Sequence, residues 1–138
     1  MPDCQAPPIA AAATVVGPAA ETVAETVAVV DFETTGMGPA QGARATEIAV
    51  VLVQGGRITG RYASLMRTGV WVPPFIEQLT GISNRMLADA PPAAQVMREV
   101  AAFTRGCALV AHNASFDRGF WQAEHAQAGV DEAVQQAP

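Results

Sequence analysis

Two carboxylates, Asp31 and Glu33, end an apolar run in this sequence. The residues before them are β-branched or small and apolar, so positions 27–36 predict a buried strand followed by its stop. Side chains at positions i and i+2 of a strand share a face, so the two acids should point together while Phe32 points into the core. Such a pair can bind a hard cation, or it can form a strand end that only contacts water.

A third carboxylate, Asp117, follows a second apolar run at positions 107–111 and falls in the first turn of a predicted helix. If the two apolar runs form neighbouring parallel strands, all three carboxylates converge at one edge of the sheet. Oxygen ligands without histidine or cysteine favour Mg²⁺ or Mn²⁺ over zinc. Two such ions about 4 Å apart suit the hydrolysis of phosphodiester bonds.

The remaining patterns predict a mixed α/β domain. Strands are expected over 46–53 and 58–66, joined by a hairpin at Gly55-Gly56, and a helix followed by the run at 107–111 then completes a crossover. The helices are expected over 75–80, over 83–88 with Ser83 as its cap, from Pro91-Pro92 to Gly106, and after 112–115 with Asn113 or Ser115 as its cap.

Composition limits the classes of function. The chain has 138 residues, half of them hydrophobic, which is enough for one domain with a core. Its net charge of -5 argues against nucleic-acid binding through a basic surface, so bound cations would have to supply positive charge. Residues 1–26 are rich in alanine and proline and predict a flexible tail or a docking arm, with the domain over 27–138.

The location is expected to be cytoplasmic. The two cysteines, Cys4 and Cys107, lie far apart without the spacing of a metal site, which indicates a reducing compartment. We expect no membrane span and no secretory signal, because no apolar run approaches about 20 residues and the chain does not start with a basic segment before an apolar block.

Three motifs occur in order along the chain: Val-Val-Asp-Phe-Glu-Thr-Thr-Gly at 29–36, Leu-Thr-Gly-Ile-Ser at 79–83, and His-Asn-Ala-Ser-Phe-Asp at 112–117. With the glycine hairpin between the first two, they resemble the motifs of the DEDD family of 3′→5′ exonucleases. The likeness is strongest to the DEDDh type, and within it to the proofreading epsilon subunit of bacterial DNA polymerase III. It covers residues 27 to about 129.

The resemblance implies a ribonuclease H-like fold, in which a mixed five-stranded sheet with three antiparallel strands first is flanked by helices. The four strands expected here match the first four of that sheet. It also implies that Asp31, Glu33 and Asp117 are catalytic ligands of two Mg²⁺ or Mn²⁺ ions. The implied partners are DNA 3′ ends, single-stranded or frayed, and a DNA polymerase subunit.

Substrate-binding residues are likewise implied by position in the family motifs. They would meet the 3′-terminal nucleotide, its base and sugar, and the nucleotide before it. They are Thr34, Thr35, Gly36, Leu79, Thr80 and Phe116.

One family feature is missing downstream of the second motif: a third motif, His-x4-Asp or Tyr-x3-Asp, which supplies the general base and a fourth acid in that family. His125 and Asp131 are one residue too far apart for it and are expected to be ordinary surface residues. His112 is expected to bond to backbone in its turn, and Tyr62 to pack. We therefore expect a C-terminally truncated exonuclease domain that lacks the last strand and closing helices and has weak activity.

Three other functions remain open on the sequence. The chain could hold single-stranded nucleic acid or a polymerase without cutting. It could be a 3′→5′ exoribonuclease of the same family, since spacing does not resolve sugar selectivity. It could also be a fragment without function.

Overall fold

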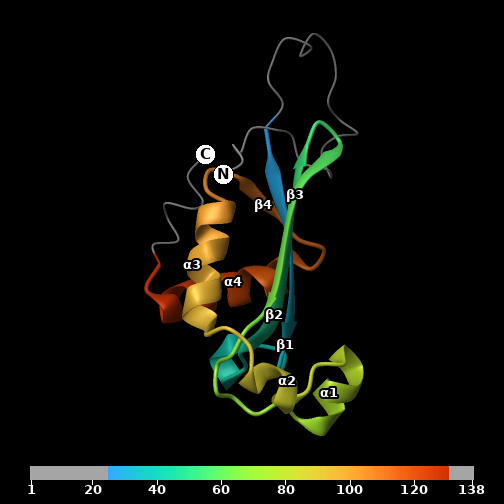
Figure 1. Ribbon diagram of the computed structural model, residues 1–138. Helices are drawn as coiled ribbons and strands as arrows, with labels where there is room; N and C mark the ends of the chain where they lie inside the picture. Colours follow the sequence, from blue (N-terminus) through green and yellow to red (C-terminus); the bar gives the residue numbers. More distant parts are fainter. Residues whose placement is uncertain (1–24, 131–138) are drawn as a thin grey trace.

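The computed structural model describes residues 25–130 as one sheet with helices on its sides (Figure 1). The expected tail at 1–26 lies almost entirely outside the described residues, as do Cys4 and Asp131. The elements are β1 (Val27–Thr34), a 3-10 turn η3 (Pro39–Gln41), β2 (Ala45–Gln54), β3 (Arg57–Leu65), α1 (Pro74–Thr80), α2 (Asn84–Ala88), α3 (Ala93–Phe103), β4 (Ala108–Val110) and α4 (Ala114–Ala128).

The four strands form one mixed sheet in the order β3-β2-β1-β4. β1 and β2 are antiparallel, β2 and β3 are antiparallel, and β4 pairs with β1 in parallel. α3 carries the chain from the end of the meander back to the start of β4. This is the expected arrangement of three antiparallel strands followed by a crossover to a parallel strand.

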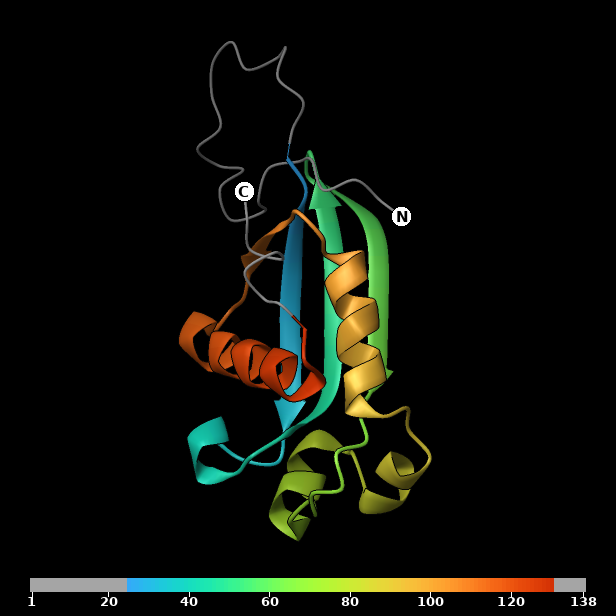
Figure 2. The ribbon, with the colours of Figure 1, turned by 90° about the vertical axis from the view of Figure 1, so that its left-hand side faces the viewer.

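One face of the sheet carries the core. α3 and α4 lie side by side over this face in Figure 2. Along β1 the alternate residues Ala28, Val30 and Phe32 are buried toward these helices, together with Ile48, Val50 and Leu52 from β2. The other face is not covered by α3 or α4, and we call it the open face.

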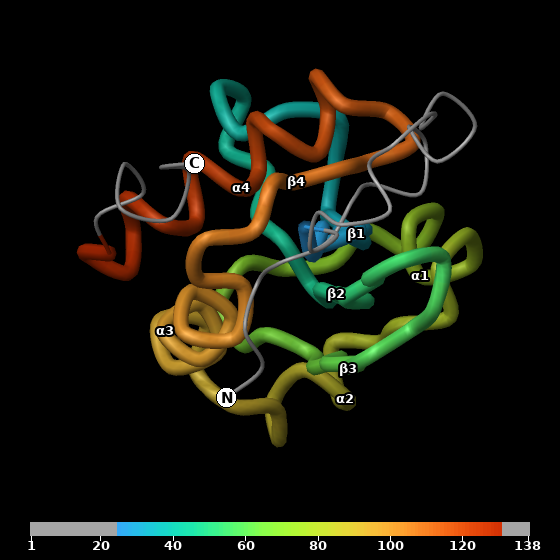
Figure 3. Tube along the Cα trace, turned by 90° about the horizontal axis from the view of Figure 1, so that it is seen from above, coloured from blue at the N-terminus to red at the C-terminus, as the bar shows by residue number. Residues whose placement is uncertain are grey.

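α1 and α2 form a separate unit beyond the end of the sheet where β1 finishes, and α1 lies on the opposite side of the sheet from α3 (Figures 1 and 3). A second, small core holds this unit: Val72, Ile82 and Leu87 are buried together, and Leu65 of β3 packs against them. Ser83 caps α2 as predicted, because its hydroxyl accepts the amide of Met86 at 3.1 Å.

The segment before α1 is fixed by Asn84. Its amide oxygen accepts Val72 N at 2.7 Å, and its amide nitrogen donates to Val72 O at 3.0 Å. We expect Asn84→Ala to lower the unfolding free energy by about 1–3 kcal/mol, since two backbone groups lose their partners. Thermal melts and hydrogen exchange at the Val72 amide would measure this. Gln95→Ala is the control, because its bond to Glu99 lies on the surface and its loss should change neither.

The structure corrects two details of the sequence prediction and decides between the alternatives of a third. β4 is shorter than 107–111 and is exposed or half-buried, because it lies at the sheet edge with β1 as its one strand neighbour. Of the two predicted cap positions of α4, Asn113 is the N-cap residue, although its side chain makes no capping bond, and Ser115 lies inside the helix. Cys107 is buried and is not a free thiol, against the expectation of reduced cysteines.

Tyr62 packs as expected, with its ring 5.9 Å from that of Phe103. Among the residues that the structure describes, no helix is long and apolar enough to cross a membrane.

Candidate active site

The carboxylates of β1 take the positions that the strand alternation predicts. Phe32 is buried in the core, whereas Asp31 is exposed and Glu33 is half-buried on the open face. β1 is a central strand, with β2 on one side and β4 on the other. β2 pairs with the backbone at both acids, whereas β4 pairs only with Val27–Val29 at the start of the strand.

Asp117, in the first turn of α4, lies at the same end of β1 although it is distant in the sequence. Because β4 runs parallel to β1, the chain leaves β4 at this end of the sheet and turns directly into α4. Asp117 is 5% exposed, and its Oδ1 accepts the backbone amide of Phe32 at 3.2 Å. This bond ties the first turn of α4 to the residue between the two strand acids.

The three carboxylates lie close enough to influence one another electrostatically. Burial raises the pKa of Glu33 above its usual 4.5, and the charges of Asp31, Glu47 and Asp117 raise it further. Burial also raises the pKa of Asp117, and the charge of Asp31 adds to this, while the hydrogen bond from Phe32 N opposes it. Glu33 and Asp117 are thus harder to ionise, in part because of the charge of Asp31.

Glu47 is a site residue that the motif reasoning misses. It is the register partner of Glu33 on β2, so the two carboxylates lie side by side on the open face. Like charges in direct cross-strand positions are destabilising unless a cation lies between them. Glu47 could be recognised from the sequence only if the pairing register of β1 and β2 were known, because that register places it opposite Glu33.

Among residues 25–130, no basic side chain forms an ion pair with these acids. Over residues 25–130 the one ion pair joins Arg44 to Glu124, away from the three acids. An all-oxygen donor set with uncompensated negative charge fits a hard divalent cation. The side chains are not drawn together in advance, however, because the described part of the chain holds no preformed cluster of three or more metal-ligating side chains.

The two threonines at the end of β1 form hydrogen bonds to backbone groups of the turn that follows and of the residue before β2. Thr34 Oγ1 donates to Gly36 O at 2.6 Å, and Thr35 Oγ1 accepts Arg44 N at 3.0 Å. Thr35 N also donates to Arg44 O, so the turn is closed on both sides. Gly36 has little room for a side chain, since a Cβ there would lie 3.3 Å from that of Ala43. These residues shape the turn beside the acids, and their predicted contact with substrate stays a prediction.

The other three predicted substrate residues differ in their solvent exposure and in the contacts that they already make. Leu79 is exposed on α1. Thr80 is half-buried, and its hydroxyl donates to Ile76 O at 2.9 Å. Phe116 is half-buried, with its ring 5.0 Å from that of Phe120 in the core. Leu79 is therefore the member of this group most available to a ligand.

The two histidines occupy different environments. His112 is exposed in the turn before α4, near enough to Asp117 for its charge to lower the pKa of that carboxyl. His125 is fully buried, and its Nδ1 lies 2.8 Å from Trp121 O. The prediction that His125 is a surface residue is wrong. Along α4, Asp117, Phe120 or Trp121, and His125 follow one another at intervals of three or four residues, so they share one face of the helix, and that face is buried. This spacing is the sequence signal for the burial of His125.

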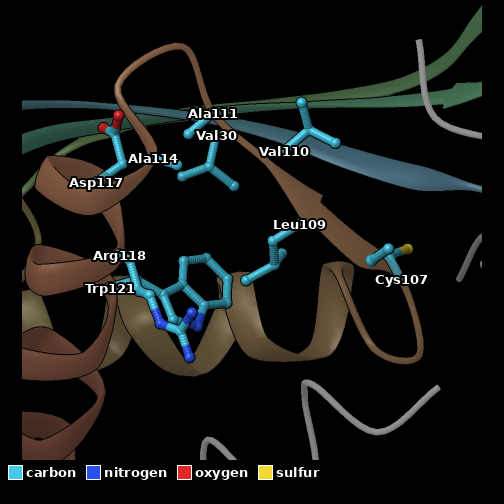
Figure 4. A pocket seen from close by; sticks show the side chains of 10 residues that line it. Val30, Cys107, Leu109, Val110, Ala111, Ala114, Asp117, Arg118 and Trp121 are labelled. Carbon is cyan, nitrogen blue, oxygen red and sulfur yellow. The ribbon is translucent and has the colours of Figure 1, made fainter. Parts of the chain in front are cut away.

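Behind the acids lies an apolar cavity of about 340 Å³ between β4 and α4. Its lining includes Val30, Leu109, Val110 and Trp121. Figure 4 shows the indole of Trp121 and the side chain of Leu109 facing this space, while the carboxylate of Asp117 points away from it. Asp117 and Arg118 are also among its lining residues, so the cavity adjoins the carboxylate group although the Asp117 carboxylate does not face it.

An ion pair between the half-buried Arg44 and the buried Glu124 lies next to this turn. Arg44 Nε and Nη2 donate to the two carboxylate oxygens of Glu124, both at 2.9 Å. Glu124 also accepts the amide of Ala45 at 3.1 Å. This links the middle of α4 to the start of β2, next to the residue that holds Thr35.

The sheet order, the parallel β1–β4 pair and the acids at the end of β1 define a ribonuclease H-like exonuclease fold. Solved structures share it. Exonuclease I from Methylocaldum szegediense superposes with a TM-score of 0.74 at 18% identity, covering 81% of this chain and 26% of that one. A zinc-bound E. coli exonuclease I complex with single-stranded DNA gives 0.71 at 16% identity, covering 80% and 25%.

The family model RNase_T, described as Exonuclease, matches residues 28–136, and the chain belongs to this family. It is similar to the 3′-5′ exonuclease DinG of Bacillus subtilis (strain 168), at 43% identity over 101 residues, which are 73% of this chain and 11% of that protein. The DinG protein of Staphylococcus aureus (strain USA300) is 40% identical over 95 residues, 69% and 10% of the two chains. The chain thus spans about a tenth of the length of these relatives.

The raised pKa of Glu33 leads to a stability prediction. Its carboxyl is harder to ionise in the folded chain, so ionisation costs stability: the cost is absent at low pH and fully present at neutral pH. In chelator at pH 7, Glu33→Gln should therefore raise the unfolding free energy by about 0.2–1 kcal/mol through relief of cross-strand repulsion.

Thermal melts at pH 7 and at a pH below the usual value of 4.5 would check this prediction. The gain should vanish at the lower pH, where the native Glu33 is already protonated. Glu77→Gln, which removes an exposed carboxylate from α1, is the control. A loss of stability in Glu33→Gln at pH 7 would contradict the repulsion that the geometry indicates.

Proposed function

We propose that this chain is an exonuclease domain that removes nucleotides from the 3′ ends of DNA with the help of two Mg²⁺ or Mn²⁺ ions. The observation that carries the proposal is the arrangement of Asp31, Glu33 and Asp117 at one end of β1, with no neutralising ion pair among the described residues. The domain would extend over residues 27–138, and the expected cytoplasmic location is part of the same proposal.

Asp31, Glu33 and Asp117 would hold the cations. When bound, divalent ions supply a hydroxide nucleophile at neutral pH and stabilise the charge that develops at the phosphate. The chain's own part is to position the ligands: the Phe32 amide holds Asp117, and β2 and β4 hold β1. Thr34, Thr35 and Gly36 would shape the site for the terminal nucleotide, with Leu79, Thr80 and Phe116 around it.

DNA as the substrate is supported by the similar proteins, which include 3′-5′ exonucleases and an exonuclease I in complex with single-stranded DNA. The resemblance of the three motifs to the proofreading epsilon subunit supports a frayed or mismatched 3′ end as the preferred form. A DNA polymerase subunit is the matching candidate partner. A 3′→5′ exoribonuclease is the alternative within the family.

A second candidate function is a module that holds single-stranded nucleic acid or a polymerase without cutting. It is favoured by the state of the histidines in the described part of the chain. His125 is buried against Trp121, and His112 is left as the one exposed imidazole near the acids. Neither histidine begins a His-x4-Asp motif downstream of Asp117: His112 is the first residue of the second motif itself, and His125 and Asp131 are one residue too far apart.

A single-turnover assay separates the two functions. The chain is mixed with a 5′-labelled oligonucleotide, single-stranded or annealed with a 3′ mismatch, in Mg²⁺, in Mn²⁺ or in chelator. The exonuclease proposal expects a ladder of products shortened from the 3′ end that disappears in chelator. An oligonucleotide that stays bound but intact in all three conditions would support the binding module instead, and an RNA oligonucleotide of the same sequence tests the sugar.

A further inference from the structure

Three large apolar side chains on and next to α1 are exposed to solvent. Trp71 is 72% exposed, Phe75 is 70% exposed and Leu79 is 74% exposed. Phe75 and Leu79 are four residues apart on α1 and so lie on one face of the helix, and Trp71 comes three residues before the helix begins. We call these three residues the aromatic patch. Exposed apolar groups of this size usually mark a binding surface.

The backbone under the aromatic patch is held firmly. Val72, next to Trp71, is buried in the small core with Ile82 and Leu87, and both of its backbone polar groups bond to Asn84. Pro73 and Pro74 follow, and proline fixes φ. Trp71 is thus presented outward from a fixed segment, which reduces the entropy cost of binding a ligand there.

The patch lies close to the carboxylates. Its supporting core packs on Leu65, which is the register partner of Glu47, and Glu47 is in turn the partner of Glu33. Adjacent strands are about 4.8 Å apart, so Leu65 lies roughly 10 Å from Glu33 on the same face of the sheet. Figure 3 shows α1 on this side of the sheet, opposite α3. A chain bound at the acids can therefore continue onto α1.

Charge indicates how such a chain would be held. Between positions 66 and 90 two arginines, Arg67 and Arg85, are balanced by two acids, Glu77 and Asp89, and the whole chain carries -5. Attraction of phosphates is therefore weak on this segment. Single strands also bind by stacking their bases on aromatic side chains, which tolerates any sequence and needs no positive charge.

We propose that Trp71 and Phe75 stack on unpaired bases of single-stranded DNA, upstream of the 3′-terminal nucleotide that the acids hold. The inference rests on the proposed function for the identity of the ligand. It adds a subsite for the nucleotides that precede the cleaved one. It also predicts that the chain prefers oligonucleotides with several unpaired nucleotides over dinucleotides, which are too short to reach the patch.

Fluorescence gives a direct test, because the chain has two tryptophans and Trp121 is 2% exposed. Oligothymidylate added in chelator should quench Trp71, with a dissociation constant that changes little with salt. Gln95→Ala, a surface change on α3, should bind and quench as the native chain does. Trp71→Ala and Phe75→Ala should each weaken binding, followed by anisotropy of a labelled oligonucleotide, by about 5- to 150-fold.

Two variants serve as controls. Trp71→Phe keeps a stacking ring and should largely keep the affinity. Ile58→Ala removes another exposed apolar side chain at the hairpin, the far end of β3 from the patch, and should change nothing. In Mg²⁺, the double variant Trp71→Ala/Phe75→Ala should lose kcat/KM on long oligonucleotides but not on a dinucleotide.

The outcomes separate this inference from the proposed function. Hydrolysis with unchanged binding in both alanine variants would overturn the subsite and leave the exonuclease standing. Binding that depends on Trp71 without any hydrolysis would support the subsite and overturn the exonuclease. Dimers of the native chain that Trp71→Ala converts to monomers, with no quenching by DNA, would show that the patch binds a second copy and overturn the inference.

Discussion

Replacing Asp31 with asparagine is expected to lower the single-turnover rate of 3′-nucleotide release by about 10³-fold. Loss of one carboxylate ligand removes several kcal/mol of transition-state stabilisation by the bound cations, and about 4 kcal/mol corresponds to this factor. The fold should survive, because Asp31 is exposed and its charge raises the pKa of both Glu33 and Asp117. Rates with a labelled oligonucleotide and a thermal melt would be measured together.

Asp89→Asn is the matched control for Asp31→Asn. It makes the same chemical change at an exposed aspartate after α2. Its rate should equal that of the native chain. Equal rates for Asp31→Asn and the native chain would remove Asp31 from the catalytic group, whatever the rate itself.

Replacing Arg44 with alanine is expected to lower the unfolding free energy by about 3–5 kcal/mol, the usual cost of leaving a buried charge without its partner. Glu124 is fully buried, and both of its oxygens accept hydrogen bonds from the guanidinium of Arg44. For a domain of this size the melting temperature should fall by about 12 °C or more. Thermal and urea unfolding at pH 7 would measure the loss.

The double variant Arg44→Met/Glu124→Leu tests the cause of that loss. An apolar pair of similar volume removes both charges, so it should recover much of the stability that Arg44→Ala loses. Arg98→Ala, an exposed arginine on α3, should be neutral. If the double variant is no more stable than Arg44→Ala, packing of the arginine stem and not the stranded charge explains the effect.

Local signals are sufficient to predict most of the elements. The alternation along β1, the Gly55-Gly56 turn and the Ser83 cap each depend on a few neighbouring residues, and each is found in the structure. The direction of Asp31 and Glu33 follows from the same alternation. These predictions succeed because the pleat of a strand and the open amides of a helix end have strict local requirements.

Other parts of the site depend on distant pairs, which local patterns do not encode. Arg44 and Glu124 are 80 positions apart, and the Phe32–Asp117 bond joins residues 85 positions apart. The place of Glu47 depends on a strand register. The exposure of β4 depends on what lies beyond the sheet edge, whereas its composition indicates only an apolar strand.

The parallel pairing of β1 with β4 also determines the order in which the site forms. β1, β2 and β3 are joined by short connections, so the meander can form early and already carries Asp31, Glu33 and Glu47. β4 must first close a loop of about 80 residues, and such distant contacts form late. Asp117 is therefore expected to be the last of the acids to take its place in the site during folding. When β4 and α4 unfold locally, Asp117 is also the first of the acids to be lost from the site.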